Sequence, residues 1–189
     1  IDRHVNSSEN FNQKLNKQKA EFETTFLKRN DPFTALFTSG TTGNPKGVIY
    51  PNEMLSAIAA YMLYGIDLRK NDNFWCMADP GWAYGLLYSI IGPLLIGHST
   101  TMYEGAFSVD STISVIEKFK INNLAGAPTV YRLLMKSNKE TIIKLRNKLR
   151  IASSAGEPLN PELQRWANNE LGLPLYDHYG QSEFGMSLI

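Results

Sequence analysis

The chain has 189 residues, 43% of them hydrophobic and 20% charged, which is the composition of a soluble globular protein with one substantial packed domain. A net charge of +1 gives no electrostatic basis for binding nucleic acid or an acidic membrane surface, and the longest apolar stretch, residues 85–97, is too short to span a bilayer. The single cysteine, Cys76, cannot form an internal disulfide, which fits a reducing compartment and predicts a cytoplasmic protein.

The chain begins with isoleucine rather than methionine, which suggests a piece of a longer protein. Within residues 1–30, four apolar side chains recur at helical spacing in a polar and basic background, namely Phe11, Leu15, Phe22 and Phe26. We predict an amphipathic helical segment here that packs one apolar stripe on the core. Its apolar face is narrow and its lysines are mixed with glutamates, which argues against a helix that binds a membrane surface or nucleic acid.

From residue 31 onwards, short apolar runs alternate with helical patterns of apolar spacing. Strands are expected at residues 33–38, 74–77, 100–103, 123–125, 149–153 and 175–177. Helices are expected at residues 52–64, 84–96, 110–120, 128–137, 139–145 and 161–171. The last helix should begin with an N-cap at Asn160 and with Pro161 at its first position. This alternation predicts an α/β fold for residues 31–189, with a mostly parallel sheet flanked by helices.

Five short polar or glycine- and proline-rich segments each follow an expected strand. They are TSGTTGNPKG (residues 38–47), ADPGW (78–82), AGAPT (125–129), SAGEP (154–158) and YGQSE (179–183). Ligands of open α/β sheets bind at the carboxyl ends of the strands. A parallel sheet would therefore bring all five segments to one edge, and we predict one composite binding site there.

The first of these segments is a glycine-rich loop with several hydroxyls and one lysine, which suggests phosphate binding. A Walker A loop needs a lysine directly after a glycine and a hydroxyl after the lysine, whereas Lys46 follows Pro45 and precedes Gly47. A Rossmann fingerprint is excluded because the chain has no G-x-G-x-x-G. What remains is a loop whose backbone N–H groups and hydroxyls can wrap the β- and γ-phosphates of a nucleotide, with Lys46 as a point charge.

The loop resembles the phosphate loop of the AMP-forming, adenylate-forming enzymes, which include acyl-CoA synthetases, luciferases and the adenylation domains of peptide synthetases. The blocks ADPGWAYG, GAPTVYRLLM, SSAGEPLNPEL and YDHYGQSE resemble further blocks of that family in the same order, so the resemblance covers residues 31–185. It is closest to the acetyl-CoA and medium-chain acyl-CoA synthetase branch. The resemblance implies that residues 31–189 form an incomplete ATP- and AMP-binding core of the family's large N-terminal domain, without its small C-terminal domain.

The resemblance also implies a two-step reaction. A carboxylate attacks the α-phosphorus of ATP to give acyl-AMP and pyrophosphate, and the thiol of coenzyme A then displaces AMP to leave an acyl-CoA. The expected partners are therefore a small carboxylic acid, ATP and coenzyme A, with Mg²⁺ as the metal. This reaction needs no strong base, so a histidine near the nucleotide is expected to be a neighbour rather than a general base.

By the same resemblance, three of the five segments, together with the two residues before the last of them, hold the nucleotide. The phosphates are assigned to Thr38, Ser39, Gly40, Thr41, Thr42, Gly43, Asn44, Pro45 and Lys46. Adenine and AMP are assigned to Gly156, Glu157, Pro158, Asp177, His178, Tyr179, Gly180, Gln181 and Ser182. Glu183 is the expected magnesium ligand, and the Tyr179 ring can stack on a purine.

The acyl pocket is assigned by resemblance to Trp82, Ala83, Tyr84, Gly85, Ala155 and Gly180, and the coenzyme A channel to Ala127 and Pro128. In the acetate-specific branch a tryptophan stands at the position of Gly180 and closes the pocket. A glycine there leaves room for several methylenes, which predicts a short- to medium-chain or branched acid rather than acetate. Tyr84 would exclude very long chains. A simple turn requirement is the alternative explanation of Gly180.

The family's ribose-binding aspartate, hinge and adenylation lysine find no counterpart in the chain, so the chain alone is expected to make little acyl-CoA. One alternative is an adenylating enzyme with an acceptor other than coenzyme A, against which the GEPLNPE block argues. The other is a nucleotide-binding fragment without catalytic activity. The sequence does not predict an oligomeric state.

Overall fold

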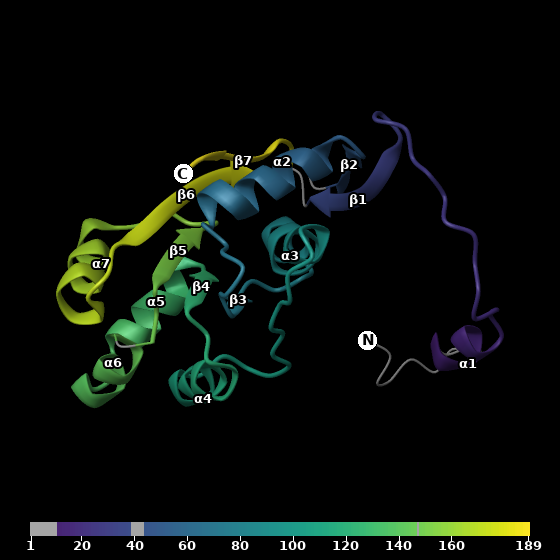
Figure 1. The fold of residues 1–189 in the computed structure, drawn as a ribbon. Helices are drawn as coiled ribbons and strands as arrows, with labels where there is room; N and C mark the ends of the chain where they lie inside the picture. Colours follow the sequence, from purple (N-terminus) through teal and green to yellow (C-terminus); the bar gives the residue numbers. More distant parts are fainter. Residues whose placement is uncertain (1–10, 39–43, 147) are drawn as a thin grey trace.

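The computed structural model describes residues 11–38, 44–146 and 148–189 (Figure 1). Its centre is a five-stranded sheet in the order β3-β4-β5-β6-β7. The strands are β3 (Phe74–Cys76), β4 (Asn123–Gly126), β5 (Ile151–Ala155), β6 (Leu175–Gln181) and β7 (Gly185–Leu188). β3 to β6 run parallel and β7 returns antiparallel to β6. The predicted α/β fold with a mostly parallel sheet is therefore confirmed.

Two expected strands differ from the structure. The first, β1 (Pro32–Thr38), pairs antiparallel with β2 (Lys46–Pro51) in a separate two-stranded sheet. The glycine-rich loop thus connects two strands of a hairpin and does not follow a strand of the parallel sheet. The strand expected at residues 100–103 is reduced to a single bridge between Thr101 and Trp75.

Helices cover both faces of the five-stranded sheet, and the alternation of strand side chains separates the two layers. Trp75 and Leu124 pack on one face with α4 (Val109–Phe119), α5 (Pro128–Met135), α6 (Lys139–Arg146), α7 (Pro161–Trp166) and the π-helical turn η3 (Ala167–Leu171). Cys76 and Ala125, each one residue further along, pack on the other face. There they meet α2 (Met54–Ala60) and the π-helical segments η1 (Tyr61–Gly65) and η2 (Gly85–Ile91), the latter continuing into α3 (Gly92–Leu95).

The start of α7 fixes how the chain leaves the SAGEP segment. Asn160 is the N-cap, as predicted: its Oδ1 accepts a hydrogen bond from the Leu163 N–H at 2.8 Å, and Pro161 is the first helical residue. The cap satisfies one of the free N–H groups at the helix start. It therefore anchors the chain four residues after the turn that reaches the sheet edge.

The N-terminal segment differs from the prediction in extent. α1 covers only Phe11–Asn16, and none of its residues is buried. Phe22 and Phe26 lie beyond the end of α1 and are 88% and 90% exposed. Figure 1 shows this part of the chain running in an extended form from α1 to β1. The expected packing of an apolar stripe on the core is therefore wrong for residues 11–30, which fits the marginal stability of a short helix without tertiary contacts.

Within the ranges that the structure describes, no helix has both the length and the apolar character needed to cross a membrane.

Candidate functional site

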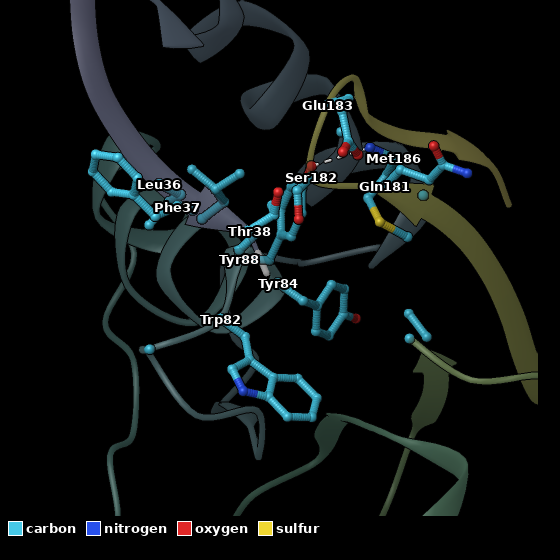
Figure 2. Close-up of a pocket in the computed structure, with 17 residues that line it drawn as sticks. Leu36, Phe37, Thr38, Trp82, Tyr84, Tyr88, Gln181, Ser182, Glu183 and Met186 are labelled. Atoms are coloured by element: carbon cyan, nitrogen blue, oxygen red, sulfur yellow. Dashed lines mark hydrogen bonds between the residues drawn. The ribbon is translucent and has the colours of Figure 1, made fainter. Parts of the chain in front are cut away.

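A cavity of about 580 Å³ lies at the carboxyl ends of β5 and β6, where β1 and the start of η2 approach the sheet (Figure 2). Four of the five predicted segments contribute to its lining, and the AGAPT segment does not. The lining residues are Leu36, Phe37, Thr38, Gly81, Trp82, Ala83, Tyr84, Leu87, Tyr88, Ala155, Gly156, Gly180, Gln181, Ser182, Glu183, Gly185 and Met186.

The two strand ends that flank the glycine-rich loop lie side by side, and one of them lines the cavity. Thr38 ends β1 and lines the cavity, and it pairs in the hairpin register with Lys46 at the start of β2. Asn44, Pro45 and Lys46 are exposed and are not lining residues. The remaining predicted phosphate ligands lie outside the described residues: Ser39, Gly40, Thr41, Thr42 and Gly43.

The turn between β6 and β7 brings Ser182 and Glu183 to the cavity. This turn is anchored from β2, because the hydroxyl of the buried Tyr50 donates to the Ser182 carbonyl at 2.6 Å. Burial, together with the negative charge of Glu183, raises the pKa of Tyr50, so its hydroxyl stays protonated and able to donate. The hairpin that carries the loop thus also holds the turn that carries the carboxylate.

Glu183 is suited to a magnesium ion that arrives with a nucleotide. Mg²⁺ in proteins is usually held by one or two carboxylates together with substrate phosphates. In the parts of the chain described here, no group of three or more acidic, histidine or cysteine side chains could enclose a metal. A single exposed carboxylate beside the Ser182 hydroxyl fits an ion whose remaining ligands are phosphate oxygens and water.

The predicted adenine turn leaves β5 at the edge of the cavity. Gly156 lines the cavity with a φ of +92°, a backbone conformation that favours glycine. Glu157 and Pro158 do not line it. The Glu157 carboxylate instead accepts hydrogen bonds from the Thr129 hydroxyl at 2.7 Å and from Arg132 at 2.6 Å, which lower its pKa. Since both donors belong to α5, Glu157 fixes the turn to that helix and supports the site through the backbone.

Residues 177–179 of β6 were also predicted to contact adenine, and none of their side chains lines the cavity. Tyr179 is half-exposed, and its hydroxyl accepts a hydrogen bond from Gln181 at 2.6 Å. Asp177 is exposed, with its pKa raised by partial burial of the carboxyl. His178 is 4% exposed, and its Nδ1 lies 2.7 Å from the hydroxyl of Tyr61. The imidazole therefore faces η1 and not the cavity.

Most of the predicted acyl-pocket residues line the cavity, and one of them lies behind the lining residues. Trp82, Ala83 and Tyr84 line the cavity on one side, and Ala155 lines it at the end of β5. In Figure 2 the Trp82 and Tyr84 side chains both lie below the Ser182 turn in the view. Gly85 is buried behind this wall and is not a lining residue.

Gly180 lines the cavity at a point where β7 lies close to β6. A Cβ atom added to it would lie 2.5 Å from the Gly185 carbonyl oxygen and 2.5 Å from Sδ of Met186. The close approach of β7 therefore requires the glycine. The volume beside it is not empty, because the Met186 side chain fills it, and an indole could enter only if β7 moved.

Several lining residues were not predicted, and they come from β1, η2 and β7. Leu87 and Tyr88 lie three and four positions after Tyr84, so helical spacing could have indicated them. The Met186 N–H donates to the Tyr88 hydroxyl at 3.2 Å, which ties β7 to η2. No local pattern marks Met186, because its place depends on the return of the chain after the Ser182 turn.

The two residues predicted for the coenzyme A channel lie apart from the cavity. Ala127 directly precedes α5 in an extended conformation, and Pro128 is the buried first residue of that helix. Neither lines the cavity. Their assignment therefore stays a prediction.

Comparison with known proteins connects this geometry with one family. The chain matches the family of AMP-binding enzymes over residues 2–189. An acetyl-coenzyme A synthetase of Bacillus subtilis is 34% identical over 181 residues, covering 95% of this chain and 32% of that protein. An acetyl-coenzyme A synthetase of Mesorhizobium japonicum is 38% identical over 185 residues, covering 90% of this chain and 28% of that protein.

Among solved structures, an acyl-CoA synthetase of Brucella canis matches with a TM-score of 0.87 and 46% sequence identity. The match covers 93% of this chain and 32% of that one. The chain spans about a third, or slightly less, of the length of the relatives it matches.

Proposed function

Because this chain belongs to the family of AMP-binding enzymes, we propose that the protein activates a carboxylic acid with ATP and transfers the acyl group to coenzyme A. One observation carries the proposal: a single cavity is lined by Thr38 at the start of the phosphate loop, by the Glu183 carboxylate, and by the apolar wall around Trp82. The names of the relatives, acetyl-coenzyme A synthetase and acyl-CoA synthetase, favour coenzyme A over another acceptor.

In the first step, a carboxylate oxygen bonds to the α-phosphorus of ATP, and pyrophosphate leaves with the electron pair of the broken P–O bond. Such a step depends on positioning and on neutralising phosphate charge. Thr38 and Lys46, which pair at the two ends of the loop, would hold the pyrophosphate. Glu183 would hold Mg²⁺, which supplies positive charge to the phosphates when bound.

In the second step, the thiol of coenzyme A gives up its proton to water, its sulfur bonds to the acyl carbon, and AMP leaves with the electron pair of the C–O bond. The Trp82 and Tyr84 wall would exclude water from the acyl-adenylate, because water at this carbon would hydrolyse it. The wall thus serves the transfer as well as the binding of the acid.

The proposed substrate is a short- to medium-chain or branched acid larger than acetate. Met186 occupies the space beside Gly180, but an unbranched thioether adapts to what it packs against more easily than an indole does. Burial of one additional methylene contributes roughly 0.8 kcal/mol, so two methylenes correspond to about a tenfold gain in kcat/KM. We expect kcat/KM for butyrate or a branched acid of that size to exceed that for acetate about tenfold. A series of acids from acetate to octanoate measures this, and acetate as the preferred acid would contradict it.

Replacing Glu183 with glutamine tests the reaction itself. In the full-length protein, Glu183→Gln should lower ATP-dependent formation of acyl-CoA on the order of 100-fold, because the neutral amide is a poor ligand for the ion that neutralises the phosphates. The control is Glu170→Gln, an exposed position on η3 that does not line the cavity. Thioester formation is followed by mass spectrometry together with pyrophosphate release. Failure of every acid in the series to give either product refutes the proposal, and acyl-AMP without thioester indicates another acceptor.

A further inference from the structure

A buried chain of polar contacts runs behind the wall of the cavity. The Tyr61 hydroxyl lies 2.7 Å from His178 Nδ1 on one side and 3.4 Å from the Tyr84 hydroxyl on the other. Tyr61 is 7% exposed and His178 4% exposed, and neither lines the cavity. Tyr84 does line it. A wall residue is thus connected through one buried hydroxyl to a strand of the central sheet.

The ring of Tyr61 is closely packed on several sides. It begins η1, and its ring lies over Gly65 so closely that a Cβ atom added there would be 2.6 Å from Tyr61 Cδ2. The ring also packs edge-on against Tyr88 and His178, with centroid separations of 4.6 Å and 5.5 Å. Only glycine at position 65 permits this packing. The hydroxyl of Tyr61 is therefore a fixed point in the helical layer.

His178 supports Tyr61 as a neutral group. Burial lowers the pKa of the imidazole to about 4, so at physiological pH the ring can share one hydrogen bond with the phenol, as donor or acceptor according to its tautomer. Burial also raises the pKa of the Tyr61 hydroxyl, which keeps its proton. The contact is thus a hydrogen bond between two neutral groups on η1 and β6.

Tyr84 is partly buried and packs against the apolar layer that contains η1 and η2. It precedes η2, its ring centroid lies 5.4 Å from that of Tyr88, and its hydroxyl lies 3.4 Å from the Tyr61 hydroxyl. Trp82, two residues earlier, is 66% exposed and offers little support. Apolar packing holds the ring, and the contact with Tyr61 adds the polar interaction that orients the Tyr84 hydroxyl in the wall.

We propose that Tyr61, held by His178, is a positioning residue that fixes Tyr84 in the cavity wall and thereby limits the length of the acid that the cavity accepts. The proposal rests on the proposed function, since it concerns the acid site of the same cavity. It assigns a role in acid selection to a residue that does not itself line the cavity. Its effect should be confined to the acid.

The test is Tyr61→Phe in the full-length protein, which removes the hydroxyl and keeps the ring packing. With Tyr84 freed, the ratio of kcat/KM for octanoate to kcat/KM for butyrate should rise three- to tenfold, while KM for ATP stays unchanged. The matched control is Tyr131→Phe, which also removes a buried tyrosine hydroxyl, bonded there to the carbonyls of Leu124 and Ser153 in the opposite layer. Tyr131→Phe should lower stability and leave the ratio unchanged.

Two further measurements separate positioning from general loosening. In a Tyr84→Ala background, Tyr61→Phe should no longer change the ratio, because its effect passes through Tyr84. A crystal structure of Tyr61→Phe should show the Tyr84 ring displaced or in two conformers. An unchanged ratio, or an unmoved Tyr84 ring, overturns the proposal. If no acid in the series yields a thioester, the proposed function fails instead, and the crystal structure still decides the position of Tyr84.

Discussion

Gly85→Ala is expected to lower the free energy of unfolding by about 3 kcal/mol and to displace one wall of the cavity. The added Cβ would overlap the backbone carbonyl of Asp79 and lie 2.8 Å from the Pro80 nitrogen. Both obstacles are main-chain atoms, so no side-chain rotation relieves them, and overpacking of this kind costs about 1–3 kcal/mol. Gly85 is also buried at the start of η2, where the helix has little room to shift.

The cavity wall should also be displaced, because Asp79, whose carbonyl the added Cβ would overlap, organises the segment before η2. Asp79 accepts hydrogen bonds from the Gly81 N–H on its carboxylate, at 2.6 Å, and from the Trp82 N–H on its carbonyl, at 3.0 Å. Moving the Asp79 carbonyl away from position 85 therefore moves Trp82 and, with it, Tyr84. Gly85 was predicted to line the acyl pocket. In the structure it is not a lining residue, and we expect its substitution to act on the cavity indirectly, by displacing Asp79 and the residues that follow it.

Chemical denaturation of the wild-type and variant proteins measures the loss. The control is Gly126→Ala, at the end of β4, where an added Cβ would meet its nearest atoms at 3.7 Å, an ordinary contact distance, without a positive φ. Gly126→Ala should change the unfolding free energy by less than about 1 kcal/mol. Equal losses in the two variants would show that the approach of Asp79 to Gly85 does not constrain the fold.

Hydrophobic periodicity predicted much of the fold. The strands found as β3 to β6 and the helices between them follow the expected ranges within a few residues, because each element buries one face and its apolar spacing records that face. Residues 11–30 show the limit of the same signal. Phe22 and Phe26 have helical spacing relative to Phe11, but spacing alone supplies no surface on which a helix could pack.

Strand partnership was the part that local pattern could not predict. β1 has the apolar run of a core strand, yet it pairs with β2 outside the parallel sheet, and β7 adds an antiparallel edge. Both pairings depend on where the chain turns back, which neither composition nor period specifies. The unpredicted strand β7 also changes the lining of the cavity, because its residue Met186 occupies the space that the sequence of β6 alone would leave open.

The clustering of the segments at the sheet edge was more predictable than the role of each residue. The ends of parallel strands meet at one edge, so the three segments that follow β3, β5 and β6 reach one cavity, and the hairpin of β1 and β2 brings Thr38 to the same place. Which side of a strand a residue faces is harder to predict at a strand end. His178 lies between two predicted nucleotide neighbours, yet its side chain pairs with Tyr61, 117 positions earlier. Only the folded layer of η1 against β6 brings them together.

At the opposite edge of the sheet, Arg150→Met is expected to lower the free energy of unfolding by about 3 kcal/mol at neutral pH. The Asp72 side chain is 3% exposed, and the Arg150 guanidinium binds both of its carboxylate oxygens. Arg150 also donates to the Asp67 carboxylate at 2.7 Å. Removing one partner of a buried ion pair leaves the other charge uncompensated, which typically costs 3–5 kcal/mol. Partial exposure of Arg150, at 26%, places the expected value at the low end of that range.

The dependence on pH identifies Asp72 as the source of this loss. Burial alone would raise the pKa of Asp72, but hydrogen bonds from Arg150, the Arg69 N–H and Asn123 bring it below its usual 3.8. In the wild type, Asp72 therefore contributes stability above pH 3.8 that is lost as the pH falls through the lowered pKa. In Arg150→Met the largest of the contributions that oppose burial is lost, while the hydrogen bonds from the Arg69 N–H and Asn123 remain. The pKa of Asp72 therefore rises, and protonation of Asp72 removes part of the destabilisation in the variant. The difference between the two proteins should be largest near pH 7 and shrink towards pH 4.

A more exposed arginine–carboxylate pair serves as the control for the effect of burial. Arg132 and Glu157 also form an arginine–carboxylate pair, with exposed fractions of 37% and 36%, so Arg132→Met should cost less than about 1 kcal/mol. The double variant Asp72→Leu/Arg150→Met should recover part of the stability that Arg150→Met loses, because no buried charge remains. Denaturant unfolding at pH 7 and pH 4 measures all four proteins. A loss in Arg150→Met that is independent of pH would mean that packing of the arginine stem, and not its charge, holds this edge of the sheet.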